Sequence, residues 1–264
     1  MKRVYKKHPV SFAATPQEGN SMKKYQFQIL SFLLPIILWE IFSLSIKSFF
    51  FPSLVAIVKE AFDNITVAKL LTNVWATLSL TLISFLVANF LGITFGYIIS
   101  VQKKVSILFS FTNDFFRSLP TIVTFPVFMT IFGINDFSKI LVTIFGLFWI
   151  VLFNTINSLQ TLSQARIKYL KSLNASSIHI FQHCVSFILR KNWITTARVS
   201  LSLSLFITTT QEMVIGSNLG IGRAIVDAKN YYEINLMYFW IIVAGILGYG
   251  LNWLVKAVEK KLEL

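Results

Sequence analysis

The sequence predicts an all-α integral membrane protein with about six transmembrane helices, and its composition and hydrophobic pattern support this fold class. Of its 264 residues, 55% are hydrophobic and 13% are charged, whereas average proteins carry about 25% charged residues. The mean hydropathy is +0.68. Hydrophobic runs extend from residue 27 to residue 255 and leave no stretch long enough for a second, soluble domain. We therefore expect a cytoplasmic tail over residues 1–26 and one membrane domain over residues 27–264.

Six apolar segments can span a bilayer, because a helix needs about 20 largely apolar residues to cross the hydrocarbon core. They cover residues 27–46, 77–101, 120–132 with a lead-in from 105, 140–157, 194–216 and 234–255. The first is too long for the apolar region of a signal peptide, and no small-x-small cleavage site follows it, so we expect it to remain as a span. The third contains Pro120 and Pro126, which predict a broken or bent helix.

The basic residues predict that both termini lie in the cytoplasm. With the amino terminus inside, the inner segments hold sixteen Lys and Arg residues and the outer segments hold six, as the positive-inside rule requires. The inner set is Lys2, Arg3, Lys6, Lys7, Lys23, Lys24, Lys103, Lys104, Arg166, Lys168, Lys171, Arg190, Lys191, Lys256, Lys260 and Lys261; the outer set is Lys47, Lys59, Lys69, Lys139, Arg223 and Lys229. This asymmetry accounts for most of the net charge of +13 without nucleic acid. We expect a multi-pass protein of the bacterial inner membrane, surrounded by lipid.

The longest inner connection, over residues 158–193, predicts two short helices joined by a turn. Apolar residues repeat at helical spacing up to Leu173. Asn174 can take the left-handed conformation that ends a helix, and Ser176 or Ser177 can cap the next one. A cytoplasmic helical hairpin is a natural docking surface for a partner, with an ordinary connecting loop as the alternative.

Several short motifs occur in a definite order between residues 51 and 263. Residues 117–140 read RSLPTIVTFPVFMTIFGINDFSKI, with an arginine, two prolines, Phe-Gly-Ile and Ser-Lys in this order. Phe-Pro-Ser at 51–53, glycines at 92 and 96, Asn-Thr at 154–155, Gln-Glu-Met at 211–213 and Gly-Ile-Gly at 220–222 accompany them. Together they resemble the permeases of binding-protein-dependent ABC importers, in the branch that serves nitrate, sulfonate, taurine and thiamine-precursor uptake.

This resemblance implies a MetI-like importer permease fold and a transport subunit rather than an enzyme. It implies a translocation path for a small solute such as a sulfonate, taurine, nitrate or a thiamine precursor. The implied partners are a second permease copy in a homodimer, two ABC ATPase subunits docked below, and a periplasmic or lipid-anchored substrate-binding protein. No glycine in the chain is followed by lysine, so the Walker A loop is missing, and we expect ATP hydrolysis in a separate chain.

The resemblance also places the ATPase-coupling motif in the inner connection. The implied coupling residues are Leu173, Asn174, Ala175, Ser176, Ser177, Ile178 and Phe181. Ile178 and Phe181 are apolar anchors three positions apart, on one helix face. The motif departs from the family pattern, because Lys168, Asn174 and Phe187 stand at its glutamate, glycine and proline positions. Asparagine tolerates a left-handed turn, whereas the reversed charge at Lys168 implies an unusual ATPase partner or weakened coupling.

Ionisable residues within the predicted spans are candidates for function or for packing. Glu212 lies in the outer third of the fifth span, where a charge is costly and usually faces a cavity or a partner. We predict that it lies beside the translocation path, with a structural hydrogen bond between helices or to the outer loop as the alternative. Glu40 is assigned a structural role. Asp114 and Arg117 are spaced to pair with each other on a helix.

The sequence gives little support to metal, redox or ion-driven chemistry. His179 and His183 would share one helix face, but no third ligand is evident, so we expect no metal and no cofactor. Cys184 is the only cysteine, which excludes an internal disulfide. A secondary transporter or channel is the main alternative function, and a membrane-embedded enzyme is another. Paired inverted repeats with broken spans are not evident, which disfavours the first of these.

Overall fold

The computed structural model describes residues 19–101, 103–161, 169, 172–174, 176 and 185–261. The regular elements in this part of the chain are helices, which confirms the predicted all-α class. The chain divides into two compact units, Met1–Ala56 and Ile57–Leu264. His179, His183 and Cys184 lie outside the described residues.

The first unit contains α1 (Gly19–Ile46) and the turn that follows it. The ring of Trp39 stacks on Phe51 with the ring centroids 4.2 Å apart. The carboxyl group of Glu40 accepts a hydrogen bond of 2.8 Å from the backbone N–H of Leu54, where the next helix begins. This bond satisfies one of the free N–H groups at a helix start. Glu40 therefore has the structural role that the sequence predicts.

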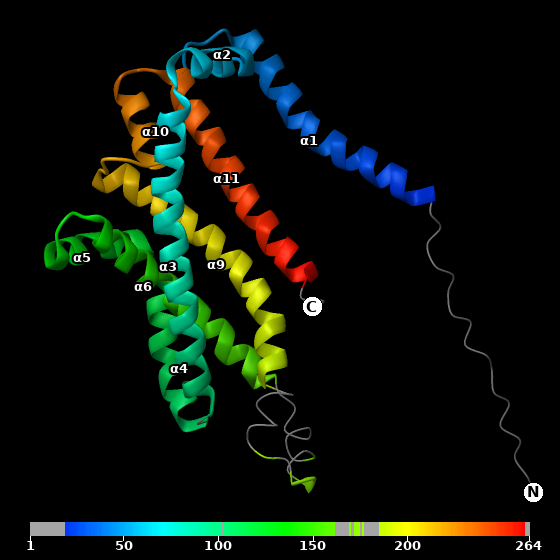
Figure 1. The fold of residues 1–264 in the computed structure, drawn as a ribbon, viewed down its shortest axis with the longest axis vertical. Coiled ribbons are helices and arrows are strands. Elements are labelled where there is room, and N and C mark those ends of the chain that lie inside the picture. Colours follow the sequence, from blue (N-terminus) through cyan, green and yellow to red (C-terminus); the bar gives the residue numbers. More distant parts are fainter. Residues whose placement is uncertain are drawn as a thin grey trace, which may run out of the picture. The chain divides into compact units, whose positions relative to one another are not determined.

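The second unit is a helical bundle with α3, α6 and α9 at its centre (Figure 1). Its helices are α2 (Leu54–Asn64, which begins in the first unit), α3 (Val67–Val101), α4 (Lys103–Ser118), the 3-10 helix η1 (Thr121–Thr124), α5 (Phe125–Phe132), α6 (Asp136–Gln160), α9 (Ser186–Ile215), α10 (Ile221–Asn230) and α11 (Ile234–Lys261). α3 packs mainly on α6 and α9, and α9 also contacts α10 and α11. α9 is therefore enclosed by its neighbours on several sides.

Gly92 and Gly96 allow α3 to pack closely on α6. A Cβ atom built on Gly92 would lie 2.7 Å from Cβ of Val151, and one built on Gly96 would lie 2.7 Å from Cβ of Thr155. Larger residues at these positions would therefore push the helices apart. Small residues four positions apart are a common means of helix packing in membranes, where lipid supplies no hydrophobic driving force between helices.

α9 carries a polar stripe that faces the interior of the bundle. Its members recur along one face of the helix and are at most 1% exposed: Ser200, Ser204, Thr208, Gln211 and Glu212. Ser204 Oγ donates to the backbone carbonyl of Thr81 on α3 at 2.8 Å, and Gln211 Nε2 donates to Thr143 Oγ1 on α6 at 3.0 Å. Polar groups within a bilayer need partners inside the protein, so this stripe joins α9 to both neighbouring helices.

Among the described residues, 3 helices are long and apolar enough to cross a membrane, namely α3, α6 and α11. If α4 and α5 together form one bent span, the number rises to 4. The predicted count of six stays a prediction. The pair bends by 90°, which confirms the predicted break of the third segment. Pro120 stands at the bend, and proline cannot donate to the hydrogen-bond ladder of a helix. α9 has 30 residues, but its polar stripe lowers its hydropathy.

α4 carries the predicted pair of Asp114 and Arg117. Arg117 Nη2 lies 3.1 Å from Asp114 Oδ1, which confirms the pairing. The same guanidinium lies 3.8 Å from the centre of the Phe153 ring on α6. A cation on the face of an aromatic ring is favourable, so Arg117 also holds α4 against α6.

Three helices begin at least eight residues earlier than the spans predicted for them. α1 begins at residue 19 rather than 27. α3 begins at residue 67 rather than 77, because Leu70 and Val74 pack on the buried cluster around Trp240. α9 begins at residue 186 rather than 194, and Trp193 in this extension packs on the buried cluster around Leu201. Packing contacts within the protein therefore extend α3 and α9 past the apolar segments from which the spans were predicted.

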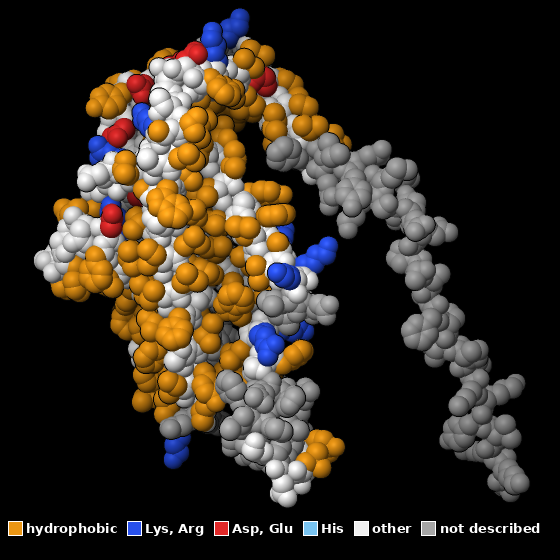
Figure 2. Space-filling model, viewed as in Figure 1, with side chains coloured by type: hydrophobic (Ala, Val, Ile, Leu, Met, Phe, Trp, Pro, Cys, Tyr) orange, Lys and Arg blue, Asp and Glu red, His pale blue; other side chains and the backbone are white. Residues whose placement is uncertain are grey.

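Hydrophobic side chains cover the flank of the bundle, while Asp and Glu side chains gather near the end that carries α10 (Figure 2). The exposed apolar residues of α3 include Leu71, Trp75, Ile83, Leu86, Phe90, Phe95 and Ile98. Soluble proteins rarely expose a continuous apolar surface of this kind. The chain is therefore embedded in lipid.

Candidate functional site

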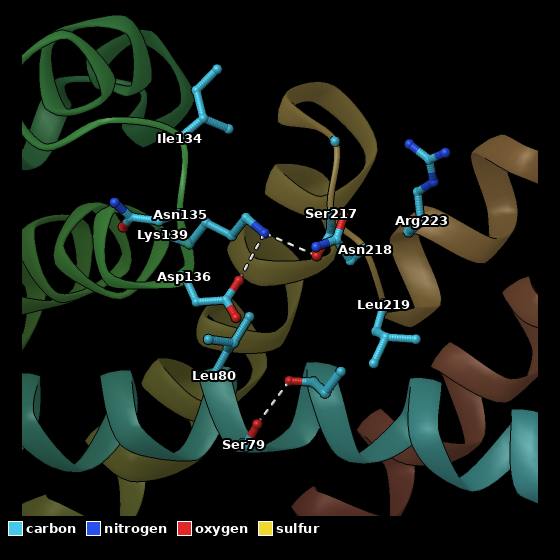
Figure 3. Close-up of a pocket in the computed structure, with 12 residues that line it drawn as sticks. Ser79, Leu80, Ile134, Asn135, Asp136, Lys139, Ser217, Asn218, Leu219 and Arg223 are labelled. Atoms are coloured by element: carbon cyan, nitrogen blue, oxygen red, sulfur yellow. Dashed lines mark hydrogen bonds and ion pairs between the residues drawn. The ribbon is translucent and has the colours of Figure 1, made fainter.

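A cavity of about 660 Å³ lies where α3, α6 and α9 approach α10 (Figure 3). We call it the loop pocket, because the loop between α9 and α10 forms one wall. Its lining residues are Ala76, Ser79 and Leu80 of α3, Ile134, Asn135, Asp136 and Lys139 around the start of α6, Gly216, Ser217, Asn218 and Leu219 of the loop, and Arg223 of α10. Its size lies in the range of about 300–1,000 Å³ that small-molecule sites occupy.

Lys139 is a buried cation in the wall of the loop pocket. Its side chain extends from the first turns of α6 towards Ser217 (Figure 3) and is 3% exposed. The ammonium group donates to Asp136 Oδ1 at 3.0 Å and to Ser217 Oγ at 2.9 Å. Asp136 is 70% exposed. Lys139 therefore joins α6 to the loop while its charged partner stays in contact with solvent.

Arg223 supplies a second positive charge to the loop pocket. Its Nε donates to Asp227 Oδ2 at 2.9 Å within α10. A Cβ atom built on Gly216 would lie 3.9 Å from Arg223 Nη1, so the guanidinium lies beside the loop. A neighbouring cavity of about 520 Å³ shares Asn218, Leu219 and Arg223 with the loop pocket. The two cavities therefore border each other along the loop.

Glu212 lies near the carboxyl end of α9, before the loop, and joins the start of α10 to α3. Its carboxyl group is fully buried and accepts hydrogen bonds from Thr77 Oγ1 at 2.9 Å and from the Gly222 N–H at 2.8 Å. Thr77 Oγ1 accepts a further bond of 2.8 Å from the Ile221 N–H. This chain of bonds satisfies two N–H groups at the start of α10, which a helix leaves unpaired. The carboxyl group also lies at the positive end of the helix dipole.

Gly220 and Gly222 leave the room that the Glu212 side chain occupies. Gly220 has φ 132°, and a Cβ atom there would overlap the Glu212 carboxyl group. A Cβ atom on Gly222 would lie 2.8 Å from Glu212 Cβ. The Gly220 N–H donates to Asn73 Oδ1 on α3 at 2.8 Å. The two glycines of the Gly-Ile-Gly motif therefore make room for the buried Glu212 side chain. The backbone N–H groups of the motif also bond Asn73 and Thr77 of α3.

A comparison with protein families decides the class to which this arrangement belongs. Residues 88–264, about two thirds of the chain, match the family described as binding-protein-dependent transport system inner membrane component. The chain belongs to this family. The resemblance seen in the sequence is thereby confirmed, and the protein is a membrane-embedded transport component.

Two relatives and one solved structure place this permease more closely. SsuC of Bacillus subtilis, a putative aliphatic sulfonates transport permease protein, is 23% identical over 211 residues, which cover 80% of this chain and 76% of SsuC. ThiX of Halalkalibacterium halodurans, a formylaminopyrimidine transport permease protein, is 24% identical over 238 residues, which cover 89% and 92%. A chain of the inward-facing MetNI methionine ABC transporter matches with a TM-score of 0.64 at 18% identity, covering 74% of this chain and 96% of its own. The MetI-like fold and the class of ABC importer permease are confirmed.

The structure of this permease connects Glu212 to the Gly-Ile-Gly motif, but Glu212 is not among the residues that line the loop pocket. Its hydrogen bonds agree with the structural alternative, and a place beside the translocation path stays a prediction. The sequence placed Lys139 in the Ser-Lys pair of the motif over residues 117–140 and among the outer basic residues, but gave it no role at a site. The available signal was Asp136, an acidic residue three positions earlier at the start of a helix.

The predicted coupling segment of the permease is described only in part. Asn174 has φ 56°, which confirms the predicted left-handed conformation. The side chain of Leu173 is 61% exposed, and Phe187 lies exposed in the first turn of α9. Ser176 is exposed as well. The other predicted coupling residues lie outside the described residues: Lys168, Ala175, Ser177, Ile178 and Phe181.

Proposed function

We propose that this permease forms the translocation path of an ATP-driven importer for a small solute, within the range of sulfonates, taurine, nitrate and thiamine precursors. Membership of the family over residues 88–264 is the observation that carries the proposal. The named solutes of two relatives, aliphatic sulfonates for SsuC and formylaminopyrimidine for ThiX, support this range. The loop pocket, at about 660 Å³, has room for such a solute.

The proposed assembly contains two copies of the permease as a homodimer, two ABC ATPase subunits, and a periplasmic or lipid-anchored substrate-binding protein. The family description, which names dependence on a binding protein, supports the last of these partners. The missing Walker A loop supports a division of labour in which ATP hydrolysis occurs in a separate chain.

The proposed orientation places both termini in the cytoplasm of a bacterial cell, with the tail of residues 1–26 ahead of a permease domain over residues 27–264. The excess of basic residues in the inner segments supports it. In this orientation the loop pocket and α10 face the outside, where a binding protein would deliver the solute. Glu212 then lies beside the outer end of the path and holds the loop that borders it.

The hairpin over residues 158–193 is the proposed ATPase docking element. The exposed Leu173 and the left-handed turn at Asn174 support this role, because an exposed turn is open to contact with a partner. The remaining proposed contacts are Ala175, Ser176, Ser177, Ile178 and Phe181. Lys168 replaces a glutamate of the family motif, so the matching ATPase surface should carry a complementary charge.

Native mass spectrometry of the permease co-expressed with its ATPase tests this assembly. We expect a complex with two copies of each subunit, and no ATP hydrolysis by the permease purified without the ATPase. A permease that remains monomeric in the ATPase complex, or that hydrolyses ATP alone, would contradict the proposal.

A further inference from the structure

Two cations line the loop pocket, and each is paired with a carboxylate, Lys139 with Asp136 and Arg223 with Asp227 just outside the lining. The lining itself includes two basic residues, Lys139 and Arg223, and one acidic residue, Asp136. The neutral polar lining residues Ser79, Asn135, Ser217 and Asn218 add hydrogen-bonding groups. A cavity with this lining favours a ligand that carries negative charge.

The pair of Lys139 and Asp136 is asymmetric in its exposure. The lysine side chain is 3% exposed and the aspartate side chain is 70% exposed. A buried charge needs a partner, since leaving it unpaired is strongly destabilising. The exposed carboxylate of Asp136 can be hydrated when it leaves Lys139, so the exchange is feasible when another anion takes its place beside the buried lysine. Another anion could therefore replace Asp136 beside Lys139, whereas the lysine cannot leave.

The two cations also retain hydrogen-bond donors. An ammonium group has three N–H donors, and two of those on Lys139 are engaged, by Asp136 and Ser217. The guanidinium of Arg223 uses Nε for Asp227, while Nη1 lies beside Gly216 at the pocket wall. Lys139 therefore keeps one N–H donor beyond these two bonds, and the Arg223 guanidinium could contact a second part of a ligand.

We propose that the loop pocket binds the anionic group of a small solute, with Lys139 as its principal contact and Asp136 as the resident carboxylate that the solute displaces. The inference rests on the proposed function, and it narrows the solute to an anion. Arg223 contributes a second positive charge at the border with the neighbouring cavity. Burial strengthens the attraction between Lys139 and the ligand, because water screens the pair poorly.

An anionic lipid headgroup shares the chemistry of a small anionic solute, so the two sources must be separated by experiment. The full-length permease is reconstituted in nanodiscs of zwitterionic phosphatidylcholine, and binding of ethanesulfonate is measured by calorimetry at constant ionic strength. Ethanesulfonamide, which is close in shape but uncharged, serves as the matched ligand. A second set of nanodiscs contains phosphatidylglycerol.

Asp136→Asn gives the sharpest test, because the proposal predicts a gain. Removing the competing carboxylate should tighten ethanesulfonate binding by about threefold to tenfold. Asp114→Asn is the matched control, since Asp114 pairs with Arg117 at the same spacing and lies outside the loop pocket, and it should leave binding unchanged. Lys139→Met should weaken binding by about tenfold or more, and Lys139→Arg should retain it within about threefold.

Weaker or unchanged binding in Asp136→Asn would overturn the proposal, as would equal binding of ethanesulfonamide. Unchanged affinity in a folded Lys139→Met would overturn it too; if that variant fails to fold, Asp136→Asn and Lys139→Arg still decide. If phosphatidylglycerol binds at Lys139 and ethanesulfonate does not, the ligand is a lipid headgroup and the solute proposal is wrong. The binding measurement uses the permease without its ATPase. A failure of ATP-driven import would appear only in the transport assay, so the two failures can be told apart.

Discussion

Replacing Glu212 by alanine is expected to destabilise the permease. The Glu212 carboxyl group accepts hydrogen bonds from the Thr77 hydroxyl and the Gly222 N–H in a fully buried site, and alanine leaves both donors without this acceptor. An orphaned buried donor costs about 1–3 kcal/mol, so two cost roughly 2–6 kcal/mol. The Thr77 hydroxyl can turn to a backbone carbonyl one helical turn earlier, which reduces the expected loss to about 2–4 kcal/mol.

The stability of Glu212→Gln should lie between that of the wild-type protein and that of Glu212→Ala. Glutamine keeps one oxygen acceptor and the side-chain volume, so we expect about half the loss caused by alanine. The measurement is the free energy of unfolding in mixed detergent micelles. Glu60→Gln is the control, because the Glu60 carboxyl group accepts a hydrogen bond from the Asn64 side chain at the surface, and it should change the free energy by less than about 0.5 kcal/mol.

A double-mutant cycle that combines Glu212→Ala with Thr77→Val measures the coupling between the two partners of this hydrogen bond. The two single substitutions should cost less together than the sum of their separate losses, with a coupling of about 1–2 kcal/mol. If Glu212→Ala leaves the free energy of unfolding unchanged while transport is lost, Glu212 acts in the translocation path and not as the anchor of the loop.

Four further predictions concern helix packing, the coupling segment and the topology. Gly96→Ala should lower thermal stability in detergent, because its Cβ would collide with α6. Gly245→Ala in α11 meets open space and should raise thermal stability slightly. Equal effects of the two substitutions would refute the packing argument. Asn174→Gly should preserve ATPase co-purification and Asn174→Val should reduce it, since a β-branched residue resists φ 56°. Phe181→Ala should weaken ATPase binding by tens of fold, at about 2 kcal/mol for a buried aromatic anchor, without loss of permease stability. A reporter fused after Lys229 should be active only outside the cytoplasm, and an inside signal would reverse the topology.

The sequence was sufficient for features that depend on short stretches of chain. Pro120 predicts the break of the third segment, and the structure has a 90° bend there. Asn174 predicts a left-handed residue, and its φ is 56°. The spacing of Asp114 and Arg117 predicts their pairing. Each of these results follows from local backbone preference or from the geometry of one helix, which neighbouring residues determine.

The candidate site depends on packing between distant segments, and it could not be predicted in the same way. Glu212 bonds Thr77, which is 135 positions away, and Lys139 bonds Ser217, which is 78 positions away. Composition and periodicity do not specify which polar residues of two apolar helices will meet. The early starts of α3 and α9 have the same origin, because contacts with other helices extend them beyond the apolar runs.

Uptake by proteoliposomes tests the central claim, that this chain is the permease of an ATP-driven importer, most directly. The permease is reconstituted with its ATPase, and radiolabelled ethanesulfonate is supplied outside together with the binding protein. We predict accumulation in the vesicle that requires ATP at the cytoplasmic face, requires the binding protein outside, and stops when the ATPase is inactivated. Uptake that proceeds equally without ATP and follows an ion gradient would identify a secondary transporter and contradict the account.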